Sequence, residues 1–214
     1  SEEVPLRAAA GRVLAQDLRA KRTQPPFSAS AMDGYAVQEG DWATGTTLRV
    51  IGEAAAGHAF GGAVCPGEAV RIFTGAPLPA GADRVVIQED VTRTDTLITL
   101  RDTLDAGRHV RPAGGDFNEG DLFAAPRKLG PADIALSASM NHAVIPVVRT
   151  PVVAIMATGD ELVAPGEAPN PDQIIASNSY GIAAQLEAAG AETRLLPIAR
   201  DTRAALRDVF AMAK

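Results

Sequence analysis

Acidic and hydroxyl side chains stand beside glycine at four places in the chain, and these residue types can bind anions, metal ions or hydroxyl groups. The four stretches are Ser30–Ala36 (SAMDGYA), Phe73–Asp83 (FTGAPLPAGAD), Val110–Asp116 (VRPAGGD) and Ala157–Leu162 (ATGDEL). Glycine lets the backbone approach a ligand closely and adopts turn conformations that other residues avoid. These stretches are therefore the candidates for a functional site.

The first two stretches also support structural interpretations. Asp33-Gly34 is typical of a hairpin turn, in which both residues take positive φ angles. Thr74 and Gly75 follow a predicted strand, so their backbone N–H groups and the threonine hydroxyl can face an anion. A loop that is merely stiffened by proline is an equal alternative for this second stretch.

The other two stretches bring charges together. Arg111 and Asp116 flank a glycine pair and can grip a phosphate and a metal or hydroxyl, but an Arg–Asp pair that braces a turn is favoured when the stretch is taken alone. Asp160 and Glu161 follow a predicted strand, at the end where open α/β sheets bind ligands. Adjacent acids there need a cation, a proton or hydrogen bonds, which favours a functional interpretation. The next helix start, Ser177-Asn178, can offer amide donors to an anion.

Composition excludes several classes of protein. The net charge of −6 and the pI near 5.1 argue against a nucleic-acid-binding surface. No apolar run reaches the roughly 20 residues that span a bilayer. The single Cys65 and three scattered histidines exclude a disulfide framework and a zinc site. Neither G-x-G-x-x-G nor a P-loop occurs. The start has no signal-peptide pattern and no initiator Met, and the last residues continue a helical pattern, so we expect both ends to have been cut.

Periodicity and turn residues predict the elements that position these stretches. Apolar residues at helical spacing predict a short helix over residues 5–18. From about residue 47 to 123, short apolar runs between Gly, Pro and Asp predict a small β-domain. Its strands are expected at residues 48–51, 69–74, 84–88 and 97–100. Another helix is expected over residues 131–140, with Asn141 ending it at positive φ.

The residues after 149 predict one half of an open α/β sheet. The continuous apolar run Val152–Met156 is typical of a strand buried on both faces. A helix over 177–189 with Ser177 or Asn178 as N-cap and Gly190 as stop, a strand over 195–198 and a helix over 203–213 complete the βαβα order.

Taken together and in order, the motifs resemble those of the molybdopterin molybdenumtransferases, the MoeA family, which includes the E domain of gephyrin. The matching strings are Pro25–Ala36 (P-x-F-x-x-SAMDGYA), Thr74–Asp83 (TGAPLPAGAD), Val110–Phe117 (VRPAGGDF), Ala157–Val163 (ATGDELV) and Ser177–Tyr180 (SNSY). The resemblance extends over essentially the whole chain.

The resemblance implies a multidomain fold of α/β and β parts. A helical segment is expected at residues 1–25 and 123–148, an inserted β-domain at 26–122, and the first half of a doubly wound, MogA-like α/β domain at 149–214. The implied activity belongs to molybdenum cofactor biosynthesis: molybdenum from molybdate is inserted into the dithiolene of adenylyl-molybdopterin and AMP is released, with Mg2+ as cofactor.

The same resemblance implies a cytoplasmic homodimer whose active site lies between the α/β domain of one subunit and the N-terminal part of the other. Adenylyl-molybdopterin and molybdate are the expected partners, molybdopterin adenylyltransferase is a further partner that it allows, and neither nucleic acid nor a membrane is expected. The family's second Gly-rich loop and C-terminal β-domain have no counterpart in these 214 residues. We therefore expect an incomplete fragment that is inactive by itself.

Carried over by the resemblance, the catalytic residues are Asp33, Thr74, Asp116 and Glu161, and the substrate-binding residues are Ser30, Gly75, Arg111, Asp160, Ser177 and Asn178. Asp33 and Asp116 are expected to orient Mg2+, water or a pterin hydroxyl, and no metal ligand is assigned. Ala176 and Gly115 stand where the family commonly has an acid. The alternative function is a non-catalytic scaffold or peptide-binding module on the same fold; the retained carboxylates favour the enzyme.

Overall fold

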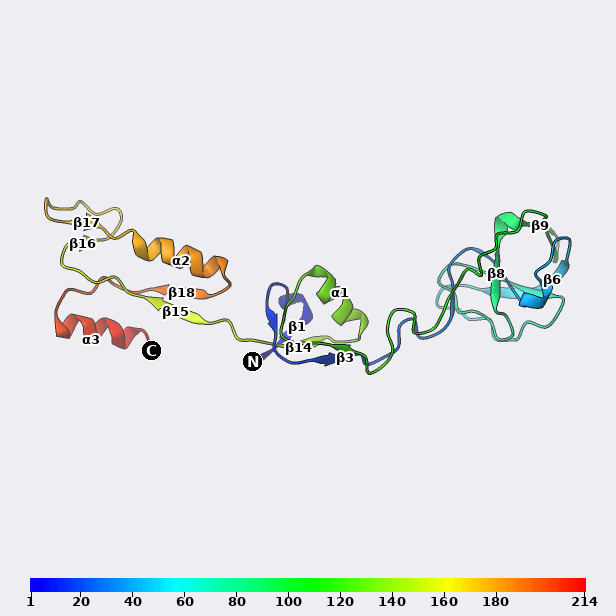
Figure 1. The fold of residues 1–214 in the computed structure, drawn as a ribbon, viewed down its shortest axis with the longest axis horizontal. Helices are drawn as coiled ribbons and strands as arrows, with labels where there is room; N and C mark the ends of the chain where they lie inside the picture. Colours follow the sequence, from blue (N-terminus) through cyan, green and yellow to red (C-terminus); the bar gives the residue numbers. More distant parts are fainter. The chain divides into compact units, whose positions relative to one another are not determined.

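The computed structural model describes residues 1–214, which divide into two compact units. The first unit consists of residues 1–17, 124–135 and 143–214, and the second consists of residues 18–123 and 136–142. Strands predominate, and three α-helices complete the structure (Figure 1). These elements confirm a multidomain fold with α/β and β parts. None of the helices is both long enough and apolar enough to cross a membrane.

A six-stranded sheet with the order β8-β5-β7-β6-β10-β9 forms the second unit. The strands are β5 (Gly34–Val37), β6 (Thr47–Ala54), β7 (Glu68–Ile72), β8 (Arg84–Ile87), β9 (Val91–Thr94) and β10 (Leu97–Leu100). Strands β6 and β7 run parallel, and every other neighbouring pair is antiparallel. The four strands predicted between residues 48 and 100 are confirmed.

Strand β5 lies between β8 and β7 in this sheet and is buried on both faces. Successive side chains of a strand point to opposite faces. Tyr35 and Val37 accordingly join one apolar cluster, together with Leu48 and Ile98, while Ala36 joins another. The chain segment that directly follows Asp33 is thus fixed by packing from both sides.

Two short antiparallel strand pairs join the N-terminal part of the second unit to its part after residue 109. They are β3 (Leu18–Arg19) with β12 (Leu122–Phe123), and β4 (Ala29–Ser30) with β11 (Val110–Arg111). The short 3-10 helices of this unit are η2 (Glu39–Asp41) and η3 (Gln88–Asp90). The β4–β11 pair places Arg111 opposite Ala29, just ahead of the SAMDGYA stretch.

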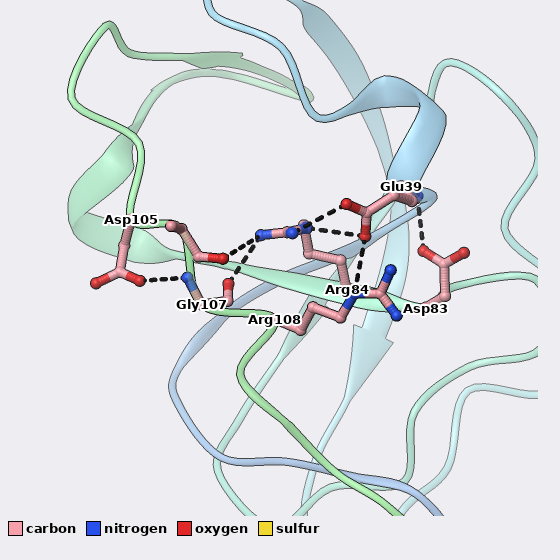
Figure 2. A network of polar contacts seen from close by, with 7 residues as sticks. Glu39, Asp83, Arg84, Asp105, Gly107 and Arg108 are labelled. Atoms are coloured by element: carbon pink, nitrogen blue, oxygen red, sulfur yellow. Dashed lines mark hydrogen bonds and ion pairs between the residues drawn. The ribbon is translucent and has the colours of Figure 1, made fainter.

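A buried arginine ties the segment before β11 to the sheet (Figure 2). Arg84 is 4% exposed and donates from Nη2 and Nε to the two carboxylate oxygens of Glu39, at 2.9 and 3.1 Å. Its Nη1 donates to the Gly107 carbonyl at 2.8 Å, and its guanidinium lies 3.8 Å from the ring centroid of Trp42. Arg108 approaches the same Glu39 carboxylate at 3.3 Å but stays exposed. Arg84 therefore fixes the course of the chain that leads to Arg111.

The first unit contains a four-stranded sheet with the order β1-β14-β2-β13. Its strands are β1 (Glu2–Pro5), β2 (Val13–Leu14), β13 (Arg127–Lys128) and β14 (Val144–Val147). The helix predicted over residues 5–18 is therefore wrong, and only the 3-10 turn η1 (Leu6–Ala8) is helical there. Gly11 has a φ of 78° and donates to the Leu129 carbonyl, so the backbone bonds with a distant segment instead of with itself.

The predicted helix near residue 131 is confirmed as α1 (Pro131–Ser139), and Asn141 beyond its end has a φ of 69° as expected. Because residues 1–25 contain no α-helix, α1 is the only α-helix of the segment predicted to be helical. That segment is mainly strand.

The residues after 149 form the predicted βαβα order. The elements are β15 (Val152–Ile155), α2 (Asn178–Ala188), β18 (Glu192–Leu195) and α3 (Arg203–Met212), with the short pair β16 (Leu162–Val163) and β17 (Ile174–Ile175) between β15 and α2. Strands β15 and β18 are parallel, and α2 and α3 lie on opposite sides of them (Figure 1). Gly190 ends the α2 region with a φ of 96°, as predicted.

Two details of this part differ from the prediction. Only Ile155 of β15 is buried, and Val152 is 54% exposed, because β18 is the single strand that pairs with β15. The second strand covers residues 192–195 and not 195–198, since Pro197 has no N–H to donate to a ladder.

Candidate functional site

The carboxylate of Asp33 is held by the neighbouring Thr74 loop. Asp33 lies between β4 and β5, and its Oδ1 accepts hydrogen bonds from the Thr74 backbone N–H at 2.8 Å and from the Thr74 hydroxyl at 2.7 Å. These two bonds, with a smaller contribution from the Arg71 charge, hold the pKa of Asp33 below its ordinary value. Oδ2 accepts no hydrogen bond from the chain. The arrangement is an ionised carboxylate with one oxygen fixed and the other available to a ligand.

Gly34 is needed for a close approach of two strands and not for a turn. A Cβ at Gly34 would lie 2.0 Å from the Val86 carbonyl oxygen of β8. Gly34 begins strand β5 without a positive φ, so the hairpin-turn interpretation of Asp33-Gly34 is wrong. The Asp33 carbonyl accepts from the Gln88 N–H at 3.1 Å, which extends the β5–β8 pairing to the candidate residue.

Ser30 and Gly75 connect the two loops through their backbones. The Gly75 N–H donates to the Ser30 carbonyl at 2.8 Å, and the Ser30 hydroxyl donates to the Met32 carbonyl at 2.5 Å. Ser30 is 1% exposed. Because the amides of Thr74 and Gly75 are both bonded within the chain, neither is free to bind an anion. In this structure these residues support Asp33, and Thr74 keeps an exposed position beside it.

Arg111 and Asp116 form an exposed ion pair across a tight loop. Nη2 of Arg111 lies 3.0 and 3.2 Å from the two carboxylate oxygens of Asp116. Gly114 takes a φ of 71° within the loop, and the Asp116 N–H donates to the Gln24 carbonyl. This geometry is that of the turn-bracing pair considered above, although about half of each side chain remains open to solvent.

In the first unit, a cavity of about 370 Å³ lies at the carboxyl end of β15. Its lining comprises Ile155, Met156, Ala157, Thr158, Leu162, Ile174, Ile175, Ala176, Ser177, Asn178, Ser179 and Ile182. Ser177 and Asn178 thus border a cavity at the start of α2, although the Ser177 side chain makes no capping hydrogen bond. This is the place where open α/β sheets bind ligands.

A second cavity of about 310 Å³ shares Ala157, Ala176 and Ser179 with the first and is also lined by Tyr180. Thr158 and Tyr180 stand within the ATGDELV and SNSY strings but were not selected as site residues. The signal that could have identified them is that their hydroxyl groups stand in the same two strings as Asp160, Glu161, Ser177 and Asn178.

Asp160 and Glu161 are exposed beside these cavities and are not part of their lining. The Asp160 carbonyl accepts from Arg200 Nη1 at 2.7 Å, and its Oδ1 accepts from the Asp201 N–H at 3.3 Å. The Glu161 carboxylate folds against Gly159, where a Cβ would meet it at 2.5 Å. Arg200, which the sequence analysis did not select, therefore fixes the backbone of this acidic pair.

The candidate residues fall into two groups that belong to different units. Asp33, Thr74 and Gly75 gather in the second unit with Ser30, Arg111 and Asp116, and Asp160, Glu161, Ser177 and Asn178 lie in the first. No group of three or more His, Cys, Asp or Glu side chains is placed to hold a metal ion. Among the candidate residues of the second unit, Asp33 is the one with a carboxylate oxygen, Oδ2, that accepts no hydrogen bond from the chain.

A two-unit chain with a supported carboxylate in its β unit and a cavity at the carboxyl end of a parallel strand has the features of a multidomain α/β ligand-binding protein. A family model described as the MoeA N-terminal region (domain I and II) matches residues 1–141. The chain belongs to the MoeA family.

Relatives support this assignment along the entire chain. The molybdopterin molybdenumtransferase of Nostoc sp. is 37% identical over 219 aligned residues, which cover 100% of this chain and 50% of that protein. The Haemophilus influenzae protein of the same name is 34% identical, with coverage of 100% and 54%. A crystal structure of the molybdopterin biosynthesis MoeA protein from Pyrococcus horikoshii matches with a TM-score of 0.87 at 33% identity, covering 99% of this chain and 56% of that one. The chain spans about half the length of the curated relatives it matches.

Proposed function

We propose that this chain acts in molybdenum cofactor biosynthesis, as part of a molybdopterin molybdenumtransferase. The reaction is the insertion of molybdenum from molybdate into adenylyl-molybdopterin with release of AMP. Membership of the MoeA family and the names of the relatives support the role. The observation that carries the chemistry is the Asp33 carboxylate, ionised by its Thr74 bonds and open at Oδ2.

Asp33 is the residue that fits a Mg2+ ion. Magnesium in phosphate chemistry is commonly held by one or two carboxylates, with the remaining ligands supplied by water and substrate phosphate oxygens. One open carboxylate oxygen meets that requirement, whereas an all-protein cage is absent. When bound, Mg2+ would supply positive charge to offset the phosphate groups of the substrate. Thr74 keeps Asp33 ionised and correctly oriented.

Residues 149–214 contribute a binding surface for the pterin substrate, as half of a doubly wound, MogA-like domain. The parallel strands and the two adjoining cavities at the carboxyl end of β15 support this assignment. Ser177 and Asn178 stand at the start of α2, where free N–H groups and the helix dipole favour a phosphate. Asp160 and Glu161 border this surface, and Arg200 beneath them limits the repulsion that an anionic substrate would meet.

The family resemblance supplies the remaining parts of the proposal. These are a cytoplasmic homodimer, the three-part domain division at residues 25, 122 and 148, and a requirement for groups that the 214 residues do not contain. The last part is supported by the length of the relatives, of which the chain spans about half. The 214-residue chain alone is therefore expected to bind substrate weakly and to release no AMP.

The test measures molybdate-dependent AMP release by the full-length protein. Asp33→Asn and Asp116→Asn are each expected to lower the rate at least tenfold, equivalent to about 1.4 kcal/mol of barrier. Asp105→Asn is the matched control, because Asp105 is also an exposed carboxylate that accepts a backbone N–H bond, from Gly107 at 2.6 Å. It should keep the wild-type rate.

Two results would contradict the proposal. A wild-type protein that releases no AMP in the presence of molybdate and Mg2+ would overturn the function itself. An Asp33→Asn variant with a lowered melting temperature but a normal rate per folded molecule would show that Asp33 only braces its loop.

A further inference from the structure

We propose that Arg71 is a positioning residue for Asp33, because its guanidinium group contacts both chain segments that form the Asp33–Thr74 pair. Arg71 lies on β7, opposite Tyr35 of β5. The proposal rests on the proposed function in that Asp33 is taken as the carboxylate that meets the substrate.

The first set of contacts reaches the segment that contains Asp33. Nη1 of Arg71 donates to the Gly34 carbonyl at 3.1 Å. Nη2 donates to the side-chain oxygen of Gln88 at 2.8 Å, and the Gln88 backbone N–H in turn donates to the Asp33 carbonyl at 3.1 Å. One guanidinium thus fixes the two peptide groups that follow Asp33, one directly and one through Gln88.

The second set of contacts reaches the segment that contains Thr74. The carbon at the centre of the Arg71 guanidinium lies 4.7 Å from the ring centroid of Phe73, which directly precedes Thr74. It also lies 5.2 Å from the ring centroid of Tyr35. Tyr35 is 4% exposed and belongs to the apolar core, so the ring cannot move away from the cation. Arg71 is therefore held against packed side chains and cannot follow a displaced loop.

These contacts require the shape of arginine and not only its charge. A guanidinium is planar, stacks on aromatic rings and donates in two fixed directions at once, whereas a lysine ammonium is a single point charge on a flexible stem. Lysine at position 71 would keep the positive charge but could not bond Gly34 and Gln88 simultaneously in the same plane. The Arg71→Lys substitution therefore separates the effect of positioning Asp33 from the effect of the positive charge.

The experiment compares Arg71→Lys with Arg49→Lys in the full-length protein. Arg49 is the matched control, because it lies on the neighbouring strand β6 and pairs with Glu68 at 2.7 Å, with its side chain 64% exposed. Two readouts are used: kcat and KM for AMP release, and the amide resonance of Thr74 in protein labelled with ¹⁵N-threonine.

Arg71→Lys is expected to lower kcat by about tenfold or more while KM changes by less than about threefold, because the carboxylate is misplaced and the binding surface is intact. The Thr74 amide resonance should shift, since that N–H donates to Asp33 Oδ1. Arg49→Lys should change neither quantity. Gln88→Ala, which removes one of the two acceptors, should move both readouts in the same direction by a smaller amount and serves as the second variant if Arg71→Lys folds poorly.

Wild-type kcat with an unshifted Thr74 resonance in Arg71→Lys would overturn the proposal, as would a loss of rate that only matches a loss of folded protein. If the wild-type protein releases no AMP, the proposed function fails, and the Thr74 resonance still decides whether Arg71 positions Asp33.

Discussion

Replacing Gly34 with alanine tests whether close strand approach fixes the Asp33 loop. A Cβ at this position would lie 2.0 Å from the Val86 carbonyl oxygen and 3.0 Å from the Ile87 Cα, and all of its nearest neighbours are backbone atoms. Backbone in a sheet cannot rotate away as a side chain can. Strands β5 and β8 would have to separate by about 1 Å, which is enough to break hydrogen bonds between them.

The expected cost follows from these contacts. Overpacking in a well-packed region costs roughly 1–3 kcal/mol. Each ladder hydrogen bond lost adds about 1 kcal/mol. Gly34→Ala should therefore lower the free energy of unfolding by about 3 kcal/mol or more, through the mechanisms that produce large single-residue effects.

The assay is urea unfolding of the 214-residue chain, followed by the fluorescence of Trp42. Trp42 is the single tryptophan and packs against the core cluster that contains Tyr35, so it reports on the six-stranded sheet. Gly61→Ala is the control, because a Cβ at Gly61 meets nothing within 4 Å and its φ is not positive. Equal unfolding free energies for the two variants would refute the close-approach argument.

Further predictions concern the ion pair between the buried Arg84 and the half-buried Glu39, again by urea unfolding followed at Trp42. Arg84→Lys should lower the free energy of unfolding by about 2 kcal/mol or more, because Arg84 is buried and loses both its bidentate bond to Glu39 and its stacking on Trp42. Arg108→Lys should lower it by less than about 0.5 kcal/mol, because Arg108 is exposed. Equal losses in the two variants would contradict this. The hydrogen bonds from Arg84, with the charges of Arg84 and Arg108, hold the pKa of Glu39 below its ordinary 4.5. Its contribution to stability is complete above pH 4.5 and is lost as pH falls toward the lower folded-state pKa. The unfolding midpoint should therefore drop as pH falls through 4.5 toward the lowered folded-state pKa of Glu39, and a drop of the same size in Glu39→Gln would show that Glu39 is not responsible.

Local patterns determined much of this protein from the sequence alone. Helices α1, α2 and α3 and the strands between residues 48 and 100 were predicted because apolar periodicity and flanking Gly, Pro and Asn act within a few residues. The family was predicted for a related reason, since five motifs in fixed order are a property of the linear chain, and the family model and the relatives confirm it.

Tertiary structure decided the rest, because the decisive partners are distant in sequence. Residues 5–18 have helical spacing, but Leu6 bonds to Ala143 and Gly11 to Leu129, and these distant hydrogen bonds prevail over local propensity. Asp33 and Thr74 are separated by 41 positions, so no sequence pattern showed that their bonds leave one carboxylate oxygen open.

Gly34 and Arg71 illustrate the same limit at single residues. Asp-Gly is a turn signal in sequence, and only the approach of β8 at Val86 shows that this glycine makes room for a neighbouring strand. Arg71 is one charged residue within a strand pattern. Its role depends on Gln88 and Tyr35, which come from two other places in the chain and meet Arg71 only in the folded sheet, together with Phe73 two positions further along.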